Sequence, residues 1–488
     1  MKFSDMKFIR RFSLNLRKSL GVPLSKMTLT SDFTDTVRGD LYPLITKDEG
    51  TVETVAGARY SVCGGCAERM VAAFFPYATY KLHIESLVGS AGFAFVAGQV
   101  RCTVLLENDE WSTVITVTHG DGTERIKVCR ELDGGICLTV TARPGFFDIY
   151  TEDGGEIRFI ATVEVPSFAE SNKNTFFGTA KVHSYLSGSA VISGMESCVD
   201  CGIGQADIRP FRYENGDVIM ENGRIFITFS ARMQAGEYQG VFSWVPGTED
   251  IKMVGALFYD SGDGYTRGEV ATAYIFDRRD STWYMWQRNA GGGHVLAKTS
   301  FKGDIRYGVN TVDVETLPLM TAENMDDTKV LGKRGDEDPD FMYDEARGKW
   351  LFAICRLAEE TKKYQYFFFE SDHPHEGYEY VGRGPAGEET GGSIVKLDGR
   401  VCFVCGNSFK DKSDYRVYEW GKFDEFTNLS SDYPDGGFRG WGTVIPIRYG
   451  TRYRYFWLTF DRVQMCKSYN WSYGNLYCFE ADGTFLLK

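Results

Sequence analysis

The sequence has none of the features that mark membrane-spanning, nucleic-acid-binding or phosphate-binding proteins. Its 488 residues contain no apolar run long enough to cross a bilayer, and residues 1–27 lack the apolar core of a secretory signal. The formal net charge of −13 disfavours nucleic acid or an anionic membrane as a partner. The glycines at 291–293 have no neighbouring lysine of a phosphate loop. We therefore expect a cytoplasmic protein with a neutral ligand, no transmembrane segment and no nucleic-acid partner.

Histidine is scarce, and cysteine is not arranged as in a small disulfide scaffold. None of the six His lies in a nucleophile motif, which disfavours Ser/His/Asp catalysis. The twelve Cys are spread along the chain, and this favours a reducing compartment. Cys402 and Cys405 lie in an apolar run, where positions three apart face opposite sides of a strand. Two other Cys-x-x-Cys pairs could together hold zinc, but we expect buried free thiols and no metal. These pairs are Cys63/Cys66 and Cys198/Cys201.

Long helical patterns are also rare, whereas glycine and aromatic residues are abundant, so the chain is expected to be all-β. The exception is residues 1–27, where Phe8, Phe12, Leu16 and Leu20 follow i, i+4 spacing among basic residues. This spacing predicts a basic helix or tail that docks on the protein itself. A membrane-surface anchor is the alternative.

Residues 28–170 contain many short alternating segments, such as 113–117 and 158–163, separated by turns such as Gly120-Asp121-Gly122. Strands at this spacing predict a β-sandwich. In its pattern the stretch resembles the concanavalin-like jelly-roll modules that accompany carbohydrate-active enzymes. Residues 171–204, which are rich in Ser and Gly, are expected to form a connection.

Residues 205–488 contain a repeated opening, at intervals of roughly 50–70 residues as expected for propeller blades. The clearest instance is Asp336-Glu337-Asp338-Pro339-Asp340, followed by the strand that begins at Lys349. Weaker instances lie at 205–208, 267–270 and 387–390, and one without an acid at 439–443. Five openings predict a five-bladed β-propeller, so the expected fold is an N-terminal sandwich followed by a propeller.

Four carboxylates lie at these openings: Asp207, Glu269, Asp338 and Glu389. The first strand of each blade lines the central channel, so we expect the four to meet at one mouth. Carboxylates that share a pocket repel one another, and one then stays protonated while another is ionised. Glycosidic bond cleavage uses such a pair.

The openings resemble those of five-bladed propeller glycoside hydrolases, the arabinanase/xylosidase type of family 43 and the invertase/levanase type of family 32. The resemblance implies that Asp207 is base or nucleophile, that Asp338 of Asp338-Pro339 holds substrate and tunes its neighbour, and that Glu389 is the general acid. The sequence departs from these families in having Ile208 where they place proline and Trp441 where the arabinanase type has histidine. Glu269, Trp286, Arg439 and Trp441 are further candidates for binding the sugar.

The sequence thus predicts a glycoside hydrolase without a cofactor, acting on small oligosaccharides that contain arabinose, xylose, galactose or fructose. Exo action is expected because an enzyme without a secretion signal meets imported fragments. A non-catalytic carbohydrate-binding protein and a propeller polysaccharide lyase are the alternatives. The oligomeric state, and the choice between retaining and inverting chemistry, stay open.

Overall fold

We analysed a computed structural model of the 488-residue chain. The structure describes the following residues: 6–15, 28–29, 44–46, 51–54, 60–109, 112–120, 122–129, 135–154, 156–200, 204–232, 237–289, 295–317, 331, 335–358, 361–385, 387–397, 399–407, 414–431, 442–461, 475–481 and 485–486.

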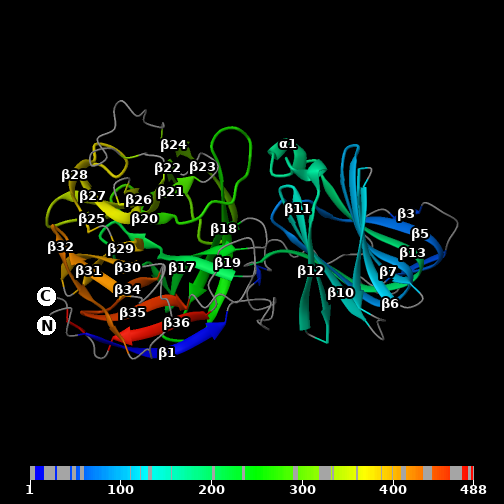
Figure 1. The fold of residues 1–488 in the computed structure, drawn as a ribbon, viewed down its shortest axis with the longest axis horizontal. Helices are drawn as coiled ribbons and strands as arrows, with labels where there is room; N and C mark the ends of the chain where they lie inside the picture. The colour runs from blue at the N-terminus through cyan, green and yellow to red at the C-terminus, as the bar shows by residue number, and fades with distance from the viewer. Residues whose placement is uncertain are drawn as a thin grey trace.

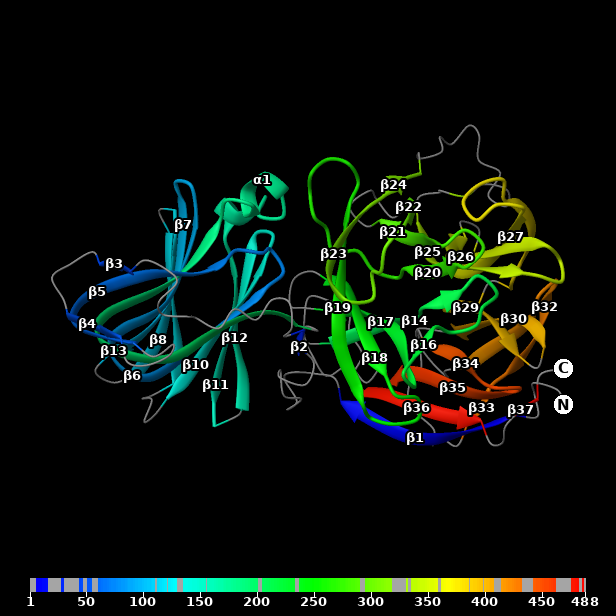
Figure 2. The ribbon, with the colours of Figure 1, turned by 180° about the vertical axis from the view of Figure 1, so that it is seen from behind.

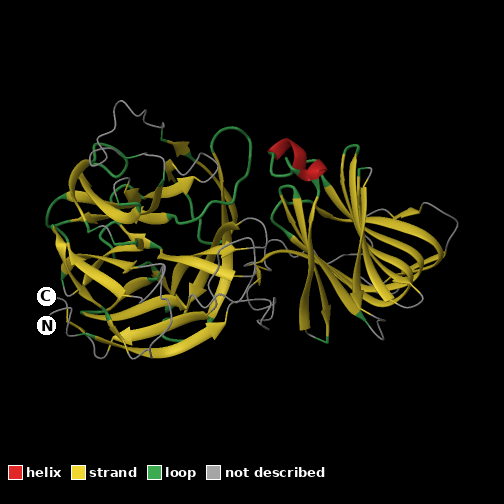
Figure 3. Cartoon of the chain, viewed as in Figure 1, coloured by secondary structure: helices red, strands yellow, loops and turns green. Residues whose placement is uncertain are grey.

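Most of the described chain is β-strand, as the composition predicts. Two bodies lie side by side along the long axis of the molecule (Figure 1). In the described ranges the one α-helix is the four-residue α1 (Asn174–Phe177), which lies on the N-terminal body (Figure 3). No helix in these ranges has the length and apolar character needed to span a bilayer.

The C-terminal body is a five-bladed propeller, which confirms the predicted architecture. Each blade is a separate, mainly antiparallel sheet built mostly from consecutive segments of the chain (Figure 2). The inner-to-outer order in blade one is β14 (Gly204–Pro210), β17 (Arg224–Arg232), β18 (Glu237–Trp244), β19 (Ile251–Asp260) and β23 (Gly308–Asp313), with β16 (Met220–Glu221) beside β17. Blade two has β15 (Arg212–Tyr213), β20 (Ala273–Asp277), β21 (Thr282–Asn289), β22 (Val295–Phe301) and β24 (Glu315–Thr316).

The remaining blades follow the same order. Blade three has β25 (Asp336–Asp344), β26 (Lys349–Ala358), β27 (Lys363–Ser371) and β28 (Glu379–Arg383). Blade four has β29 (Glu389–Leu397), β30 (Arg400–Asn407), β31 (Asp414–Glu419) and β32 (Lys422–Asn428). Blade five has β34 (Thr443–Tyr449), β35 (Arg452–Asp461), β36 (Asn475–Ala481) and β1 (Lys7–Asn15), with β33 (Ser430–Ser431) and β37 (Phe485–Leu486) at its margins. The pairs β15–β20, β19–β23 and β1–β33 are parallel.

Aromatic side chains fill the spaces between neighbouring blades. Trp286 of blade two packs edge-on against Phe352 of blade three, with ring centroids 4.9 Å apart. Tyr366 of blade three contacts Phe403 of blade four at 4.5 Å. Burial of these large apolar rings stabilises the circular arrangement, because each blade covers one face of the next.

The N-terminal segment closes the propeller, and this corrects the helix or tail expected over residues 1–27. Its described part, β1, is a strand that pairs antiparallel with β36 at the outer edge of blade five. Phe8 is fully buried and lies 5.9 Å from the ring of Trp457. The next residue, Ile9, is exposed. This alternation is that of a strand with one buried face.

Among the described residues, the N-terminal body has twelve strands in one hydrogen-bonded network around an apolar core. The two longest strands, β6 (Thr79–Ala97) and β13 (Lys181–Asp200), run through its middle, and β6 pairs with β10 through its first half and with β7 through its second. The other strands are β2 (Thr28–Leu29), β3 (Leu44–Thr46), β4 (Thr51–Thr54), β5 (Tyr60–Ala73), β7 (Val100–Asp109), β8 (Ser112–His119), β9 (Gly122–Cys129), β10 (Ile136–Arg143), β11 (Phe146–Asp153) and β12 (Glu156–Glu164). The sandwich architecture remains a prediction.

Much of the stretch 171–204, expected as a connection, is the central strand β13, which pairs with both β5 and β6. Glycine is needed here because β13 and β6 approach closely. A Cβ added at Gly188 would lie 2.5 Å from the carbonyl oxygen of Val88, and one at Gly89 would lie 2.2 Å from that of Ser187. Both glycines also have positive φ, which other residues adopt only with strain.

Tyr77 of the N-terminal body reaches the loop between β19 and β20 of the propeller. Its hydroxyl accepts a hydrogen bond from the amide of Gly268 at 3.1 Å and donates to the carbonyl of Thr266 at 3.3 Å. Its ring packs 4.8 Å from that of Phe258. The two bodies therefore meet at the segment that leads into the inner strand of blade two.

Candidate active site

The inner strands of four blades share one backbone irregularity near their beginnings. Asp207, Ala271, Asp338 and Gly391 all have positive φ, at 51°, 54°, 48° and 63°. In β14, β25 and β29 the strand pairing shifts at this point, as in a β-bulge. Bulges redirect side chains, so Asp207, Asp338 and Gly391 occupy equivalent places around the propeller mouth. Ala271, two residues before β20, has the same positive φ in blade two.

This equivalence divides the four predicted carboxylates into two groups. Asp207 and Asp338 themselves have positive φ, whereas Glu269 and Glu389 lie two residues before the residue with positive φ in their blades. The blades therefore do not present one ring of four matched acids, as the repeated openings suggested. In blades two and four the residues with positive φ are Ala271 and Gly391 instead.

Asp207 and Asp338 are both buried at the mouth. Asp207 Oδ2 accepts a hydrogen bond from Ser230 Oγ at 2.7 Å. Asp338 Oδ2 accepts one from the amide of Gly391, across the blade boundary, at 2.9 Å. Burial and the negative charge of Asp207 raise the pKa of Asp338 to about 6, although Arg209 and the Gly391 amide oppose the shift. The structure thus brings these two predicted carboxylates within electrostatic reach of each other.

Arg209 is a buried residue of this site that the sequence did not single out. Burial alone would lower its pKa, but the carboxylates of Asp340, Asp338 and Asp207 outweigh it and raise the pKa. Its Nη1 donates to the carbonyl of Ile208 at 2.9 Å. Within the described ranges its Nε and Nη2 have no hydrogen-bond partner. Arg209 therefore supplies positive charge and open donors at the carboxylate pair.

Glu389 is fully buried at the start of β29. Its Oε1 accepts from Arg416 Nη1 at 2.9 Å and from the hydroxyl of Tyr418, and both partners are on β31 of the same blade. Burial raises the pKa of Glu389, while the hydrogen bonds from Tyr418 and Arg416 act against the rise. Among the described residues Oε2 has no hydrogen-bond partner. The side chain can therefore hold a proton.

The thiol of Cys355 lies near both Glu389 and Asp338. Its Sγ donates to the carbonyl oxygen of Glu389 at 3.1 Å. Burial raises its pKa well above the usual range, and the charges of both Asp338 and Glu389 add to this rise. Asp338 and Glu389 are thus neighbours of one thiol, so Glu389 lies next to the Asp207–Asp338 pair. The hydrogen-bond partners of the Glu389 carboxylate nevertheless belong to blade four.

Glu269 has a different environment from the other three. It is buried and follows Gly268, whose amide is held by Tyr77 of the N-terminal body. Its charge contributes to the raised pKa values of Tyr77 and Tyr259. It therefore lies on the side of the mouth that adjoins the N-terminal body.

Trp286 is not available to stack on a sugar, which corrects its assignment as a binding residue. It is only 1% exposed and belongs to the apolar core between blades two and three. Its Nε1 donates to the carbonyl of Pro374 at 3.0 Å. Arg439 and Trp441, the remaining predicted contacts, lie outside the described residues.

Two further acids of blade three have structural partners. Asp336, two residues before the bulge, accepts hydrogen bonds from Arg356 at 2.6 and 3.0 Å. Asp340, two residues after it, pairs with Arg212 and accepts from the amide of Ile394 at 2.6 Å. Of the three alternating acids in this strand, the first and third thus pair with arginines. The middle one, Asp338, is the acid that faces Asp207.

No group of three or more metal-ligating side chains occurs among the described residues. Cys66 pairs with Ser187 of β13, whereas Cys198 lies eleven residues further along that strand, roughly 36 Å at the usual rise. These two thiols cannot share one zinc ion. All eight cysteines that the structure describes are buried.

Solved structures with a similar fold include several carbohydrate-active enzymes. A thermostable family-43 glycoside hydrolase shares 14% identity, covering 58% of this chain and 95% of its own, with a TM-score of 0.36. Levansucrase from Bacillus subtilis shares 11%, covering 58% and 86%, with a TM-score of 0.40. An α-L-arabinofuranosidase from Podospora anserina, solved with cellotriose, shares 12%, covering 57% and 98%, with a TM-score of 0.38.

The sequence itself matches no protein-family model and no curated protein. The five blades follow from the sheet order of this chain.

Proposed function

We propose that the protein is a glycoside hydrolase whose reaction takes place at the propeller mouth. The observation that carries the proposal is the pair Asp207 and Asp338, at equivalent bulges, with burial and the charge of Asp207 raising the pKa of Asp338. Buried carboxylates that share one site, with the pKa of one of them raised, are the groups that glycosidic bond cleavage requires.

Glu389 is proposed as the general acid. Burial raises its pKa, so it holds a proton at a pH where exposed glutamates are ionised. It would donate this proton to the oxygen of the leaving sugar. Glu388, its neighbour in sequence, has positive φ, which turns the chain just before the acid.

Asp207 is proposed as the base or nucleophile. The hydroxyl of Ser230 fixes its orientation by donating to Oδ2. It would either activate water or attack the anomeric carbon, according to the separation between the carboxyl groups of Asp207 and Glu389.

Asp338 and Arg209 are proposed to bind the substrate and set the charge of the site. The amide of Gly391 fixes Asp338, and Arg209 partly offsets the repulsion between Asp338 and Asp207. The open Nε and Nη2 groups of Arg209 are suited to donate to sugar hydroxyls. Glu269 would contact the substrate from the side of the N-terminal body.

The proposed substrates are small neutral oligosaccharides that contain arabinose, xylose, galactose or fructose, cleaved from the chain end without a cofactor. A neutral ligand fits because the mouth already contains several carboxylates. The spread of the twelve cysteines along the chain supports a reducing, cytoplasmic location.

A screen of aryl furanosides and pyranosides, followed by chromatography of oligosaccharide digests, tests the proposal. Hydrolysis by the wild type that is lost in Glu389→Gln supports it, and single sugars as the first products support exo action. Binding without turnover would favour a carbohydrate-binding protein. Unsaturated products that absorb in the ultraviolet would indicate a lyase.

A further inference from the structure

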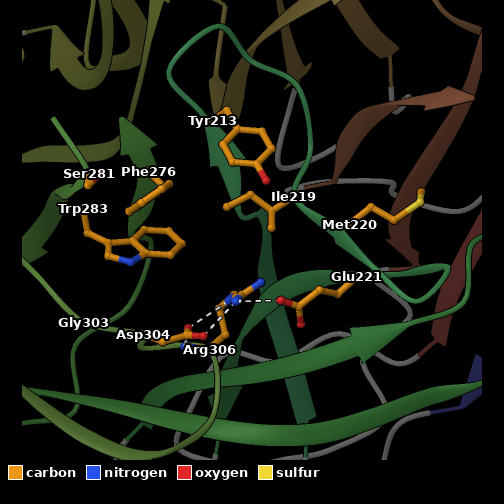
Figure 4. A pocket seen from close by; sticks show the side chains of 10 residues that line it. All are labelled: Tyr213, Ile219, Met220, Glu221, Phe276, Ser281, Trp283, Gly303, Asp304 and Arg306. Atoms are coloured by element: carbon orange, nitrogen blue, oxygen red, sulfur yellow. Dashed lines mark hydrogen bonds and ion pairs between the residues drawn. The ribbon is translucent and has the colours of Figure 1, made fainter. Parts of the chain in front are cut away.

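A second pocket lies in the propeller at the junction of blades one and two. Its volume is about 360 Å³, within the range of small-molecule sites. Aromatic residues Tyr213, Phe276 and Trp283 form one wall, and charged residues Glu221, Asp304 and Arg306 form the other. The two walls face each other across the open space in Figure 4. The pocket thus combines an apolar surface with several polar groups.

The charged wall is held in place by its own contacts. Arg306 Nη2 donates to Asp304 Oδ2 at 2.7 Å and to Glu221 Oε1 at 3.0 Å, and its Nε donates to Asp304 Oδ1 at 2.9 Å. The guanidinium also lies 4.7 Å from the ring of Phe226. The hydroxyl of Tyr307 donates to Glu221 Oε2 at 2.9 Å. A ligand would meet donors and acceptors already fixed in position, which lowers the entropic cost of binding.

This pocket is separate from the propeller mouth. Tyr213 of β15 pairs in parallel with Phe276, near the end of β20. Ala271, the residue of the same blade with positive φ at the propeller mouth, lies five residues earlier, roughly 16 Å along an extended chain. The mouth carboxylates and this pocket therefore lie at opposite ends of the inner strands.

The charge pattern indicates a neutral, hydroxyl-rich ligand. An anion would meet Glu221 and Asp304, and a cation would meet Arg306, whereas hydroxyl groups can pair with both kinds of group. A sugar ring also has an apolar face of C–H groups, which packs well on aromatic side chains such as Tyr213.

We infer that this pocket is a second carbohydrate site, which binds a neutral sugar unit without cleaving it. The choice of ligand rests on the proposed function, because the same oligosaccharides would be bound at the mouth and here. Such a site would hold one part of a substrate molecule, or a neighbouring one, close to the enzyme and raise its local concentration.

Calorimetric titration of the full chain with arabinotriose, xylotriose and kestose tests this inference. The background is Glu389→Gln, which prevents cleavage during the titration. Glu221→Ala removes a polar contact and Met220→Trp fills the space, whereas Glu315→Ala is a matched control, an exposed glutamate of β24 that does not line the pocket. Trigalacturonic acid serves as the anionic probe.

The expected result is two binding events for at least one neutral trisaccharide in the background protein. Glu221→Ala should weaken one event at least tenfold, Met220→Trp should abolish it, and Glu315→Ala should change neither. Trigalacturonic acid should not bind at the second site. A single event in the background protein, or two events that both variants leave unchanged, would overturn the inference.

The same variants separate this inference from the proposed function. In the otherwise wild-type chain, Met220→Trp should hydrolyse a small aryl glycoside at the normal rate. Normal hydrolysis without a second binding event refutes the second site alone. Two binding events in a protein without hydrolysis refute the proposed reaction and leave the second site standing.

Discussion

The amide of Gly391 donates a hydrogen bond to Asp338 Oδ2 at 2.9 Å, so that the bulge of blade four fastens the carboxylate of blade three. The two residues occupy equivalent positions in their own blades. The bulge position holds an acid, Asp338, in blade three, and in blade four it holds Gly391, whose backbone amide donates the hydrogen bond to that acid. This relationship fixes Asp338 in the position where the charge of Asp207 reaches it.

Replacement of Asp338 by Asn should stabilise the protein at neutral pH and lower its activity. The pKa of Asp338 is raised to about 6, above the unfolded value near 4. Its stabilising contribution is therefore present in full below pH about 4 and is lost as the pH rises through about 6. The cost of ionising it above that range is on the order of 2–3 kcal/mol.

Thermal unfolding of Asp338→Asn and wild type at pH 4 and pH 7 measures this effect. The melting temperature of the variant, relative to wild type, should be higher at pH 7 than at pH 4. Asp424→Asn, at an exposed aspartate of β32, should show no such difference. Equal shifts at both pH values would show that Asp338 does not titrate as described.

Replacement of Tyr418 by Phe should move the alkaline limb of the pH–rate profile to higher pH. The Tyr418 hydroxyl donates to Glu389 and opposes the rise in the pKa of that acid. Without it the pKa of Glu389 rises further. The general acid then stays protonated, and the enzyme active, to higher pH.

The pH dependence of kcat/KM for wild type and Tyr418→Phe checks this. Tyr415→Phe is the control, because Tyr415 is a buried tyrosine of the same strand whose hydroxyl makes no hydrogen bond to Glu389 among the described residues. A limb that stays in place in Tyr418→Phe, or that shifts equally in both variants, would contradict the role of Glu389 as the acid.

Replacement of Arg209 by Met should raise the pKa of Asp338 and abolish most activity. The charge of Arg209 currently lowers that pKa, and the variant leaves the two aspartates to repel each other. Activity should fall at least tenfold at pH 7, and Arg209→Lys should retain more of it because the charge remains. If Met and Lys at this position behaved alike, the charge of Arg209 would have no part in the site.

Phe8→Ala should destabilise the propeller by about 3–5 kcal/mol, the usual cost of removing a buried phenylalanine. Phe8 is fully buried beside Trp457 in the strand that closes blade five. Ile9→Ala, on the exposed face of the same strand, should cost under about 1 kcal/mol. Chemical denaturation of both variants measures the difference. Similar costs for the two would mean that β1 does not pack as described.

The repeated openings were enough to predict five blades, because each places an acid or glycine just before an apolar strand. They could not separate Asp207 from Glu269. Both acids precede a β-branched residue, so their sequence surroundings look alike. In the structure Asp207 itself has positive φ, whereas in blade two the residue with positive φ is Ala271, two residues after Glu269. The sequence likewise showed no reason why Trp286 should be buried, since that depends on Phe352 of the next blade.

The strand at the N-terminus could not be predicted from the sequence for a related reason. Phe8 and Phe12 fit helical spacing, and the pairing with β36 lies more than 460 positions away in sequence. The glycines of β13 suggested a loop. In the structure glycine is required at Gly188 because the carbonyl oxygen of Val88, on a neighbouring strand, leaves no room for a side chain. Both β1 and β13 therefore form strands because of partners that are distant in sequence.

Hydrolysis of the best oligosaccharide from the screen by Asp207→Asn tests the central claim most directly, with circular dichroism as the check on folding. The expected result is a folded variant in which kcat falls by roughly 10²–10⁴-fold. A folded Asp207→Asn protein that hydrolyses the same substrate within twofold of the wild-type rate would contradict catalysis by the carboxylates at the propeller mouth.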